Sequence, residues 1–252
     1  MKKLLFTISY VGTNFHGFQV QPKLRTVQGV FQDAAEKLFG KKLLITGCSR
    51  TDAGVHALMF CLTAEAACGG EVCSIPPERI PLAIAPYLPP DLAVLSAMEV
   101  SDDFHARYDV LYKEYMYLIL SRPTRDPFLV GRATHHPTRL DDELMNRAAK
   151  KFIGKHDFSA FMAQGSSVSS TVRTIRDFRV EREGDLVKIY VSADGFLYNM
   201  VRILSGTLIA VSDGKINISD IESIIDSRDR RRAGATLPPD GLYLNKVVYK
   251  NI

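Results

Sequence analysis

The chain has 252 residues, of which 46% are hydrophobic and 24% are charged, and its formal net charge at pH 7 is +4. This composition is that of a globular protein with enough apolar residues for a core, and it excludes a disordered or fibrous chain. No apolar run reaches the length of a membrane span, and the first residues alternate like a strand, so we expect neither a membrane segment nor a signal peptide.

Hydrophobic spacing in the first part of the chain predicts alternating strands and helices. Thr26 is a typical N-cap, and Gly40 is a typical residue at the end of a helix. The expected elements are a strand at 2–10, a Gly-punctuated loop at 11–18, a helix at 27–38, strands at 43–46 and 92–100, and a helix at 75–88. Residues 55–67 fit either a buried strand or a helix, because periodicity does not separate the two.

The second part repeats this alternation after an Arg- and Pro-rich connection. We expect strands at 112–120 and 243–249, helices at 141–152, 198–211 and 218–226, and a hairpin of 172–182 with 185–193 around Glu183-Gly184. The Ser/Gly run at 164–170 is typical of a loop. This order favours an α+β fold with two mixed-sheet halves that can share one sheet.

The most informative stretch is Gly47 to His56. It places one carboxylate, Asp52, next to Thr51 and before Ala53-Gly54, with Arg50 two residues before it. An Asx-turn, in which the carboxylate bonds its own backbone, accounts for such a pattern. Chemistry also accounts for it, because a carboxylate that a cation keeps ionised can act as nucleophile or base. These residues alone leave both interpretations open.

Two other patterns supply possible partners for Asp52. The apolar run from Gly195 ends at Arg202, and a buried arginine is rare without an acid beside it. Arg202 is therefore a candidate partner of Asp52, unless its head reaches water at a helix edge. Tyr115 and Tyr117 have strand spacing, which suits either sheet packing or stacking of one ring on a flat ligand such as a base.

The remaining polar residues give weaker signals. The arginines of 228–232 and those between 122 and 139 suit RNA phosphates, or simply a solvated face. His16, His105 and the four cysteines show no metal-ligand spacing, and no glycine-rich nucleotide motif is present, so we expect neither a metal nor a cofactor. We expect the cysteines to be reduced thiols in a cytoplasmic protein.

Several motifs together resemble the bacterial tRNA pseudouridine synthase A family, which isomerises uridines at positions 38–40 of the tRNA anticodon arm. The resemblance runs nearly end to end and is more specific than the Asp52 stretch alone. In chain order the matching motifs are residues 10–22, 26–28, 49–57, 104–107, 113–117, 195–202 and 238–244.

This resemblance implies a fold and an assembly. The fold is two RRM-like α/β halves that share one continuous mixed or antiparallel sheet flanked by helices. Residues 1–105 form the half with the catalytic loop, and residues 106–252 the half with the stacking tyrosine and the basic partner. The active species is a homodimer with tRNA across both subunits. No redox change occurs, so no cofactor is required.

The resemblance also implies residue roles. Asp52 matches the catalytic aspartate, Arg50 the arginine that replaces the flipped base in the stack, and Arg202 the basic residue that pairs with the aspartate. Tyr115 matches the tyrosine that stacks on the target uracil, and we expect Thr51, His56 and Leu197 to contact the substrate as well. Phe18 stands where many members carry tryptophan, and Leu197-Tyr198-Asn199 stands where others have histidines.

The chemistry explains these residue types. Removing a nucleotide from the stack costs a few kcal/mol, which an inserted arginine and an aromatic acceptor offset. The uracil then leaves C1′, rotates and rejoins through C5; the sequence leaves open attack at C6, attack at C1′, and a glycal route. Two other functions compete: an RNA-binding module without catalysis, and a metal-dependent hydrolase that uses Asp52 with His16 and His56.

Overall fold

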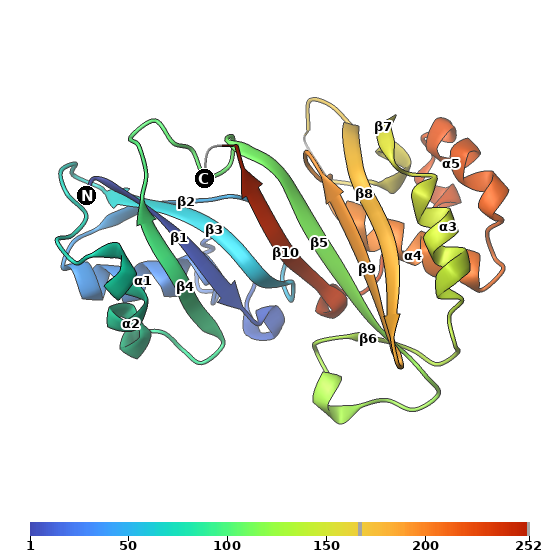
Figure 1. Ribbon diagram of the computed structural model, residues 1–252, viewed down its shortest axis with the longest axis horizontal. Helices are drawn as coiled ribbons and strands as arrows, with labels where there is room; N and C mark the ends of the chain where they lie inside the picture. Colours follow the sequence, from blue (N-terminus) through green and yellow to red (C-terminus); the bar gives the residue numbers. More distant parts are fainter. Residues whose placement is uncertain (166–167, 251–252) are drawn as a thin grey trace. The chain divides into compact units, whose positions relative to one another are not determined.

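A computed structural model describes residues 1–165 and 168–250 (Figure 1). The predicted fold class is confirmed: the fold is mixed α+β, with a large mixed sheet flanked by helices. The chain forms two compact units, unit 1 from Met1–Leu111 with the segment that begins at Leu244, and unit 2 from Tyr112–Tyr243. Ser166 and Ser167, within the run expected as a loop, lie outside the described residues.

Unit 1 is built on antiparallel strands. Their order is β4-β1-β3-β10, and β2 also pairs with β3. The bounds are β1 Lys3–Tyr10, β2 Leu43–Gly47, β3 His56–Ala66, β4 Leu92–Glu99 and β10 Leu242–Tyr249. The segment at 55–67, which periodicity left undecided, is therefore a strand. Its side chains are buried along most of its length, and this burial hides the alternation of a strand.

Helix α1 (Val27–Phe39) covers one face of these strands and ends where the sequence predicts. The Thr26 hydroxyl accepts a hydrogen bond from the Gly29 amide at 3.3 Å, which caps the first turn. Gly40 closes the helix at a φ of 69°, a conformation that glycine adopts without strain. Phe31 packs edge-on against Phe6 of β1, with ring centroids 5.1 Å apart, and this contact joins the helix to the sheet.

The helix predicted at 75–88 is wrong as one element. The structure divides it into a 3-10 turn at Pro77–Arg79, helix α2 at Ile80–Ile84 and a second 3-10 turn at Ala85–Tyr87. Pro81 and Pro86 lie inside the predicted span and have no N–H to donate, so the i to i−4 hydrogen-bond pattern cannot continue through it.

Unit 2 has the strand order β5-β9-β8-β7, and β6 pairs with β5 in parallel. The strands are β5 Val110–Ser121, β6 Thr134–His136, β7 Gly154–Asp157, β8 Val172–Glu183 and β9 Leu186–Ala193. The helices are α3 Asp142–Lys150, α4 Met200–Ser212 and α5 Ile221–Ser227. The β8–β9 hairpin is confirmed, with Gly184 at a φ of 60° in its turn.

The predicted division between residues 105 and 106 stays a prediction, because compact packing does not by itself define where a domain begins. Strand β7 is an element that the sequence did not predict; at four residues it is too short to show a period. None of the helices in the described part of the chain has the length and apolar character that a membrane span requires.

Candidate active site

Asp52 lies in the connection between β2 and β3, residues 48–55, which we call the Asp52 loop. The amide of Cys48 donates to the carbonyl of Cys61 at 2.8 Å and so continues the strand pairing into the loop. At the far end, the Val55 amide donates to the Asp52 carbonyl at 3.2 Å, and Gly54 has a φ of 80°. Main-chain bonds and a glycine in the left-handed region thus contribute to the shape of the turn.

A second loop, residues 11–18, holds the Asp52 loop along its length. The Gly54 amide donates to the Phe15 carbonyl at 3.2 Å, and the Phe18 amide donates to the Thr51 carbonyl at 3.1 Å. The two backbones approach most closely at Gly12, where an added Cβ would collide with the main chain of Val55. Glycine is required there because only a residue without a side chain permits this approach.

Two buried side-chain bonds complete this contact. The hydroxyls of Tyr10 and Thr51 are 2.8 Å apart, and the Gly12 amide donates to Nδ1 of His56 at 2.9 Å. Because Nδ1 accepts this bond, it carries no proton. Thr51 is 7% exposed and His56 is 1% exposed. These bonds join the two loops of unit 1, and contact of Thr51 or His56 with a substrate stays a prediction.

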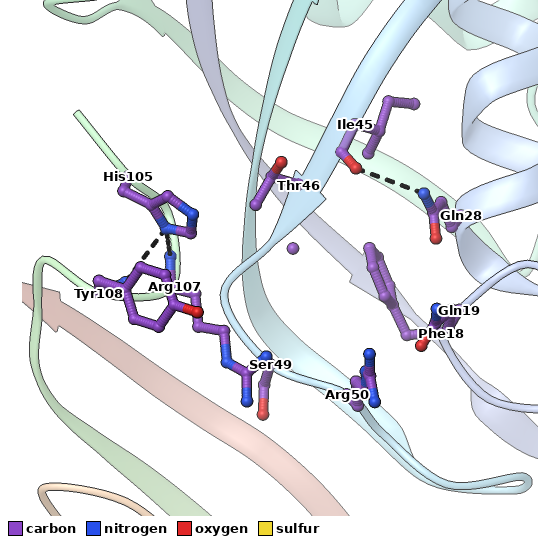
Figure 2. A pocket seen from close by; sticks show the side chains of 11 residues that line it. Phe18, Gln19, Gln28, Ile45, Thr46, Ser49, Arg50, His105, Arg107 and Tyr108 are labelled. Carbon is purple, nitrogen blue, oxygen red and sulfur yellow. Dashed lines mark hydrogen bonds between the residues drawn. The ribbon is translucent and has the colours of Figure 1, made fainter. Parts of the chain in front are cut away.

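Asp52 and Arg50 differ from these buried neighbours in their exposure. Asp52 is half-buried, and Arg50 is exposed at the start of the turn. Arg50 also lines a cavity of about 240 Å³, together with Ser49 of the same loop (Figure 2). A carboxylate on a backbone-fixed loop, with a guanidinium free to reach outwards two residues away, suits an attack on a positioned substrate.

Tyr115 lies on β5 of unit 2, opposite Val191 of β9. Its ring meets Phe196 edge-on, with centroids 5.1 Å apart, and the residue is 7% exposed. Leu197 is buried in the segment that leads into α4. The strand interpretation of Tyr115 is confirmed, and contact of Tyr115 and Leu197 with a substrate stays a prediction.

Arg202 lies in the first turn of α4 and is fixed by two acceptors within unit 2. Its Nη1 donates to Oδ1 of Asn199 and its Nε to the Leu237 carbonyl, each at 2.6 Å. Asn199 precedes the helix at a φ of 59°, a left-handed conformation that asparagine tolerates better than most residues. Asn199 and Tyr10 are thus positioning residues that the sequence did not single out.

The segment that holds Arg202 is itself packed tightly on α4. The Gly234 amide donates to the Thr207 hydroxyl at 2.9 Å, and this hydroxyl donates to the Ile203 carbonyl at 2.8 Å. An added Cβ on Gly206 would collide with the main chain of Ala235. These contacts fix the Leu237 carbonyl relative to the helix and therefore also the Arg202 guanidinium.

The arginine cluster at 228–232 is partly engaged by its own unit. Arg228 lies 3.1 Å from an oxygen of Asp157, and Arg231 pairs with Asp229 at 2.7 Å. Hydrogen bonds from Arg231 lower the pKa of Asp229 to about 2. At least these two arginines therefore stabilise local structure, whatever they contribute to RNA binding.

A metal centre finds little support. Among residues 1–165 and 168–250, no group of three His, Cys, Asp or Glu side chains is placed to hold a metal ion. His16 is exposed, whereas His56 is buried with Nδ1 bonded to Gly12. The hydrolase alternative needs both rings turned to one ion beside Asp52, and this burial of His56 argues against it.

The structure places Arg50, Thr51 and Asp52 in the Asp52 loop of unit 1, with His56 at the start of β3, and it places Leu197 and Arg202 around the start of α4 in unit 2. The pairing of Asp52 with Arg202 stays a prediction.

Comparisons with known proteins identify relatives over the whole chain. Residues 7–109 and 148–250 match a family model described as tRNA pseudouridine synthase. A protein named tRNA pseudouridine synthase A from Thermoanaerobacter sp. (strain X514) is 44% identical over 249 residues, which cover 99% of this chain and 100% of the relative. Proteins of that name from Caldicellulosiruptor saccharolyticus and Clostridium botulinum (strain Eklund 17B / Type B) are 45% and 46% identical, with the same coverage.

Proposed function

This chain belongs to the tRNA pseudouridine synthase family and isomerises uridine to pseudouridine in tRNA, and we propose that it acts at positions 38, 39 or 40 of the anticodon arm with Asp52 as nucleophile. The observation that supports this role is the Asp52 loop itself. Main-chain bonds hold the loop in shape, so the carboxylate is presented to a substrate in a fixed position.

The proposed reaction uses each polar group for one task. Arg50 enters the stack that the target uridine leaves, which offsets the cost of unstacking. Tyr115 receives the uracil on its ring, and Arg202 keeps Asp52 ionised. Asp52 assists cleavage of the bond between N1 and C1′, the uracil rotates within the site, and C5 then forms the new bond to C1′. The C5 proton is lost and N1 gains a proton. The substrate and product are isomers, so atoms and electrons balance without a co-reactant.

The test is conversion of unmodified tRNA, followed by mapping of pseudouridine along its sequence. Wild-type protein should yield pseudouridine, whereas Asp52→Asn should yield none, because it keeps the shape of the side chain and removes its charge. Asp33→Asn provides the matched control, since Asp33 is an exposed acid on α1 of the same unit. Full activity of Asp52→Asn would refute the assignment of the nucleophile.

Separate substrates are needed to test which position of the tRNA is modified. Anticodon stem-loops that carry uridine at only one of positions 38, 39 and 40 should each report whether that position is used. Product at uridines outside the anticodon arm would contradict the proposed specificity while leaving the family assignment intact.

We also propose that the protein acts in the cytoplasm as a homodimer. This proposal rests on the family resemblance. Light scattering of the purified protein alone and with tRNA would test the homodimer, and a monomer under both conditions would contradict it. Fractionation of cells followed by immunodetection would test the cytoplasmic location.

A further inference from the structure

The cavity beside Arg50 belongs wholly to unit 1 and is not used by the proposed reaction. It lies between the end of β2, the start of α1 and a turn at residues 104–109, and we call it the Tyr108 cavity (Figure 2). Its volume of about 240 Å³ is below the roughly 300–1,000 Å³ of pockets for drug-sized ligands, so it suits a fragment of the size of one base. Its lining includes Phe18, Gln28, Arg50, His105, Arg107 and Tyr108.

One wall of the Tyr108 cavity is an exposed aromatic ring held in a fixed position. Tyr108 is 73% exposed, and its ring lies 4.2 Å from that of His105, at an interplanar angle of 33°. The amides of Arg107 and Tyr108 donate to Nδ1 of His105 at 3.1 and 3.3 Å, and the His105 amide donates to Asp109 at 2.7 Å. The Arg107 guanidinium lies 5.8 Å from the centroid of the same ring. A ring held on an exposed turn in this way offers a preformed stacking surface for a flat ligand.

The turn that carries Tyr108 is anchored to the core of unit 1. The Tyr249 hydroxyl donates to the Ala106 carbonyl at 2.8 Å, and the Tyr249 ring packs on Phe104 with centroids 5.0 Å apart. Burial raises the pKa of Tyr249, so this hydroxyl keeps its proton and remains a donor at neutral pH. The wall is therefore preorganised, which lowers the entropic cost of binding.

The opposite wall is aromatic and polar. Phe18 stacks on Phe60 with centroids 4.4 Å apart, and Gln28 is fixed by a bond from its Nε2 to the Ile45 carbonyl at 3.3 Å. Arg50 and Arg107 add two guanidinium groups at the rim, both on exposed residues (Figure 2). Aromatic faces with arginines beside them are the surface that single-stranded RNA bases and their phosphates use.

From this lining we propose that the Tyr108 cavity binds a second unpaired base of the tRNA, next to the target uridine, with its base stacked on Tyr108. The inference rests on the proposed function, since Arg50 both lines the cavity and enters the stack at the position that the target leaves. The nucleotide beside that position is then the one within reach of the cavity. Neither the reaction nor the proposed residue roles require this second base, so it is a separate binding site for the same substrate.

Binding is best measured in the Asp52→Ala protein, which should hold the substrate without converting it. Single nucleotides of an anticodon stem-loop are replaced by 2-aminopurine or by an abasic sugar, and Kd is measured by fluorescence. Stacking on Tyr108 should quench 2-aminopurine at one position next to the target. Adding Tyr108→Ala should abolish that quenching and raise Kd by about 5- to 150-fold, the range for loss of one base–aromatic stack.

Combining an abasic sugar in the RNA with Tyr108→Ala in the protein shows whether the cavity binds a base or a phosphate. If the base stacks on Tyr108, an abasic sugar at that position and the Tyr108→Ala substitution should each raise Kd by the same factor. The two changes together should raise Kd no more than either one alone. Tyr108→Phe keeps the ring and should retain most of the affinity. Arg107→Ala should instead reduce the slope of log Kd against log salt by about one phosphate contact, whereas Tyr108→Ala should leave this slope unchanged.

Tyr87→Ala is the matched control, because Tyr87 is a half-exposed tyrosine of unit 1 outside the cavity. A melting curve checks folding, which truncation of an exposed ring should not change. Equal effects of Tyr108→Phe and Tyr108→Ala, or no coupling between Tyr108 and any base, would overturn the proposal. Failure of the proposed function is distinct: wild-type protein would then make no pseudouridine, whatever the binding data show.

Discussion

Tyr10→Phe tests whether the contact between the two loops of unit 1 positions Asp52. The substitution removes one oxygen and leaves the buried Thr51 hydroxyl without the partner that lies 2.8 Å away. A buried group that loses its partner costs about 1–3 kcal/mol, and Thr51 at 7% exposure falls in the lower part of that range. We expect a loss of about 1–2 kcal/mol of unfolding free energy, and a melting temperature lower by about 2–8 °C.

The same bond sets an upper limit on the kinetic effect. If all of its free energy holds the Asp52 loop in the working shape, kcat falls by at most about 5- to 30-fold. KM for tRNA should change little, because many phosphate contacts determine affinity. The assays are single-turnover formation of pseudouridine and thermal unfolding. A further Thr51→Val change should recover stability, since it removes the hydroxyl that was left unpaired.

The control for this prediction is Ser121→Ala in unit 2. The Ser121 hydroxyl is also buried, donates to the Thr138 carbonyl at 3.1 Å and accepts from the Leu140 amide at 2.9 Å. Its loss should lower stability by a similar amount and leave kcat unchanged. The positioning argument is refuted if Tyr10→Phe behaves as Ser121→Ala does. It is refuted also if kcat falls while stability does not, because the hydroxyl would then act directly on the substrate.

Three further changes test other parts of the structure. Gly12→Ala places a Cβ against a carbonyl of the Asp52 loop, so activity should fall by more than tenfold in single-turnover assays even where circular dichroism shows a folded protein. Asn199→Ala removes an acceptor of Arg202 and should lower kcat more than it raises KM, whereas Asn199→Asp keeps the acceptor and should retain more activity. Carbon NMR should give Asp229 a pKa of about 2, rising towards 3.8 in Arg231→Gln. Because the pKa of Asp229 is lower in the folded than in the unfolded chain, its pairing with Arg231 stabilises the fold above about pH 4. This stabilisation is lost as the pH falls through about 2.

How well the sequence predicts an element depends on whether its signals are local. Helix α1 has its cap at Thr26 and its terminator at Gly40, and both lie next to the apolar spacing that they limit. The segment at 75–88 has apolar residues at helical spacing, but its prolines remove backbone donors, and the spacing pattern does not register that loss. Strand β3 was undecided because the folded chain buries side chains on both of its faces, so its sequence lacks the alternation that marks a strand with one solvated face.

The candidate site, too, could be predicted from the sequence only where its signals are local. Asp52 and Arg50 were found because their motif is short and contiguous. The buried bonds of Thr51 and His56 are made with Tyr10 and Gly12, which are more than forty residues away along the chain. Burial is a property of the folded loops, so the sequence alone does not show that this hydroxyl and this imidazole are buried beside Asp52.

The two proposed catalytic charges are held by different means, and this difference predicts how each responds to change. Asp52 is positioned by main-chain bonds between two loops, whose close approach requires glycine at residue 12. Arg202 is positioned by the Asn199 side chain and by one carbonyl of the segment after the arginine cluster. Side-chain changes in these two loops should therefore be tolerated except at Gly12 and Gly54, at the buried bonds, and at Asp52 and Arg50 themselves. Around Arg202 the Asn199 side chain supplies one of the acceptors, so a carboxamide or carboxylate at residue 199 should hold the guanidinium better than an apolar side chain.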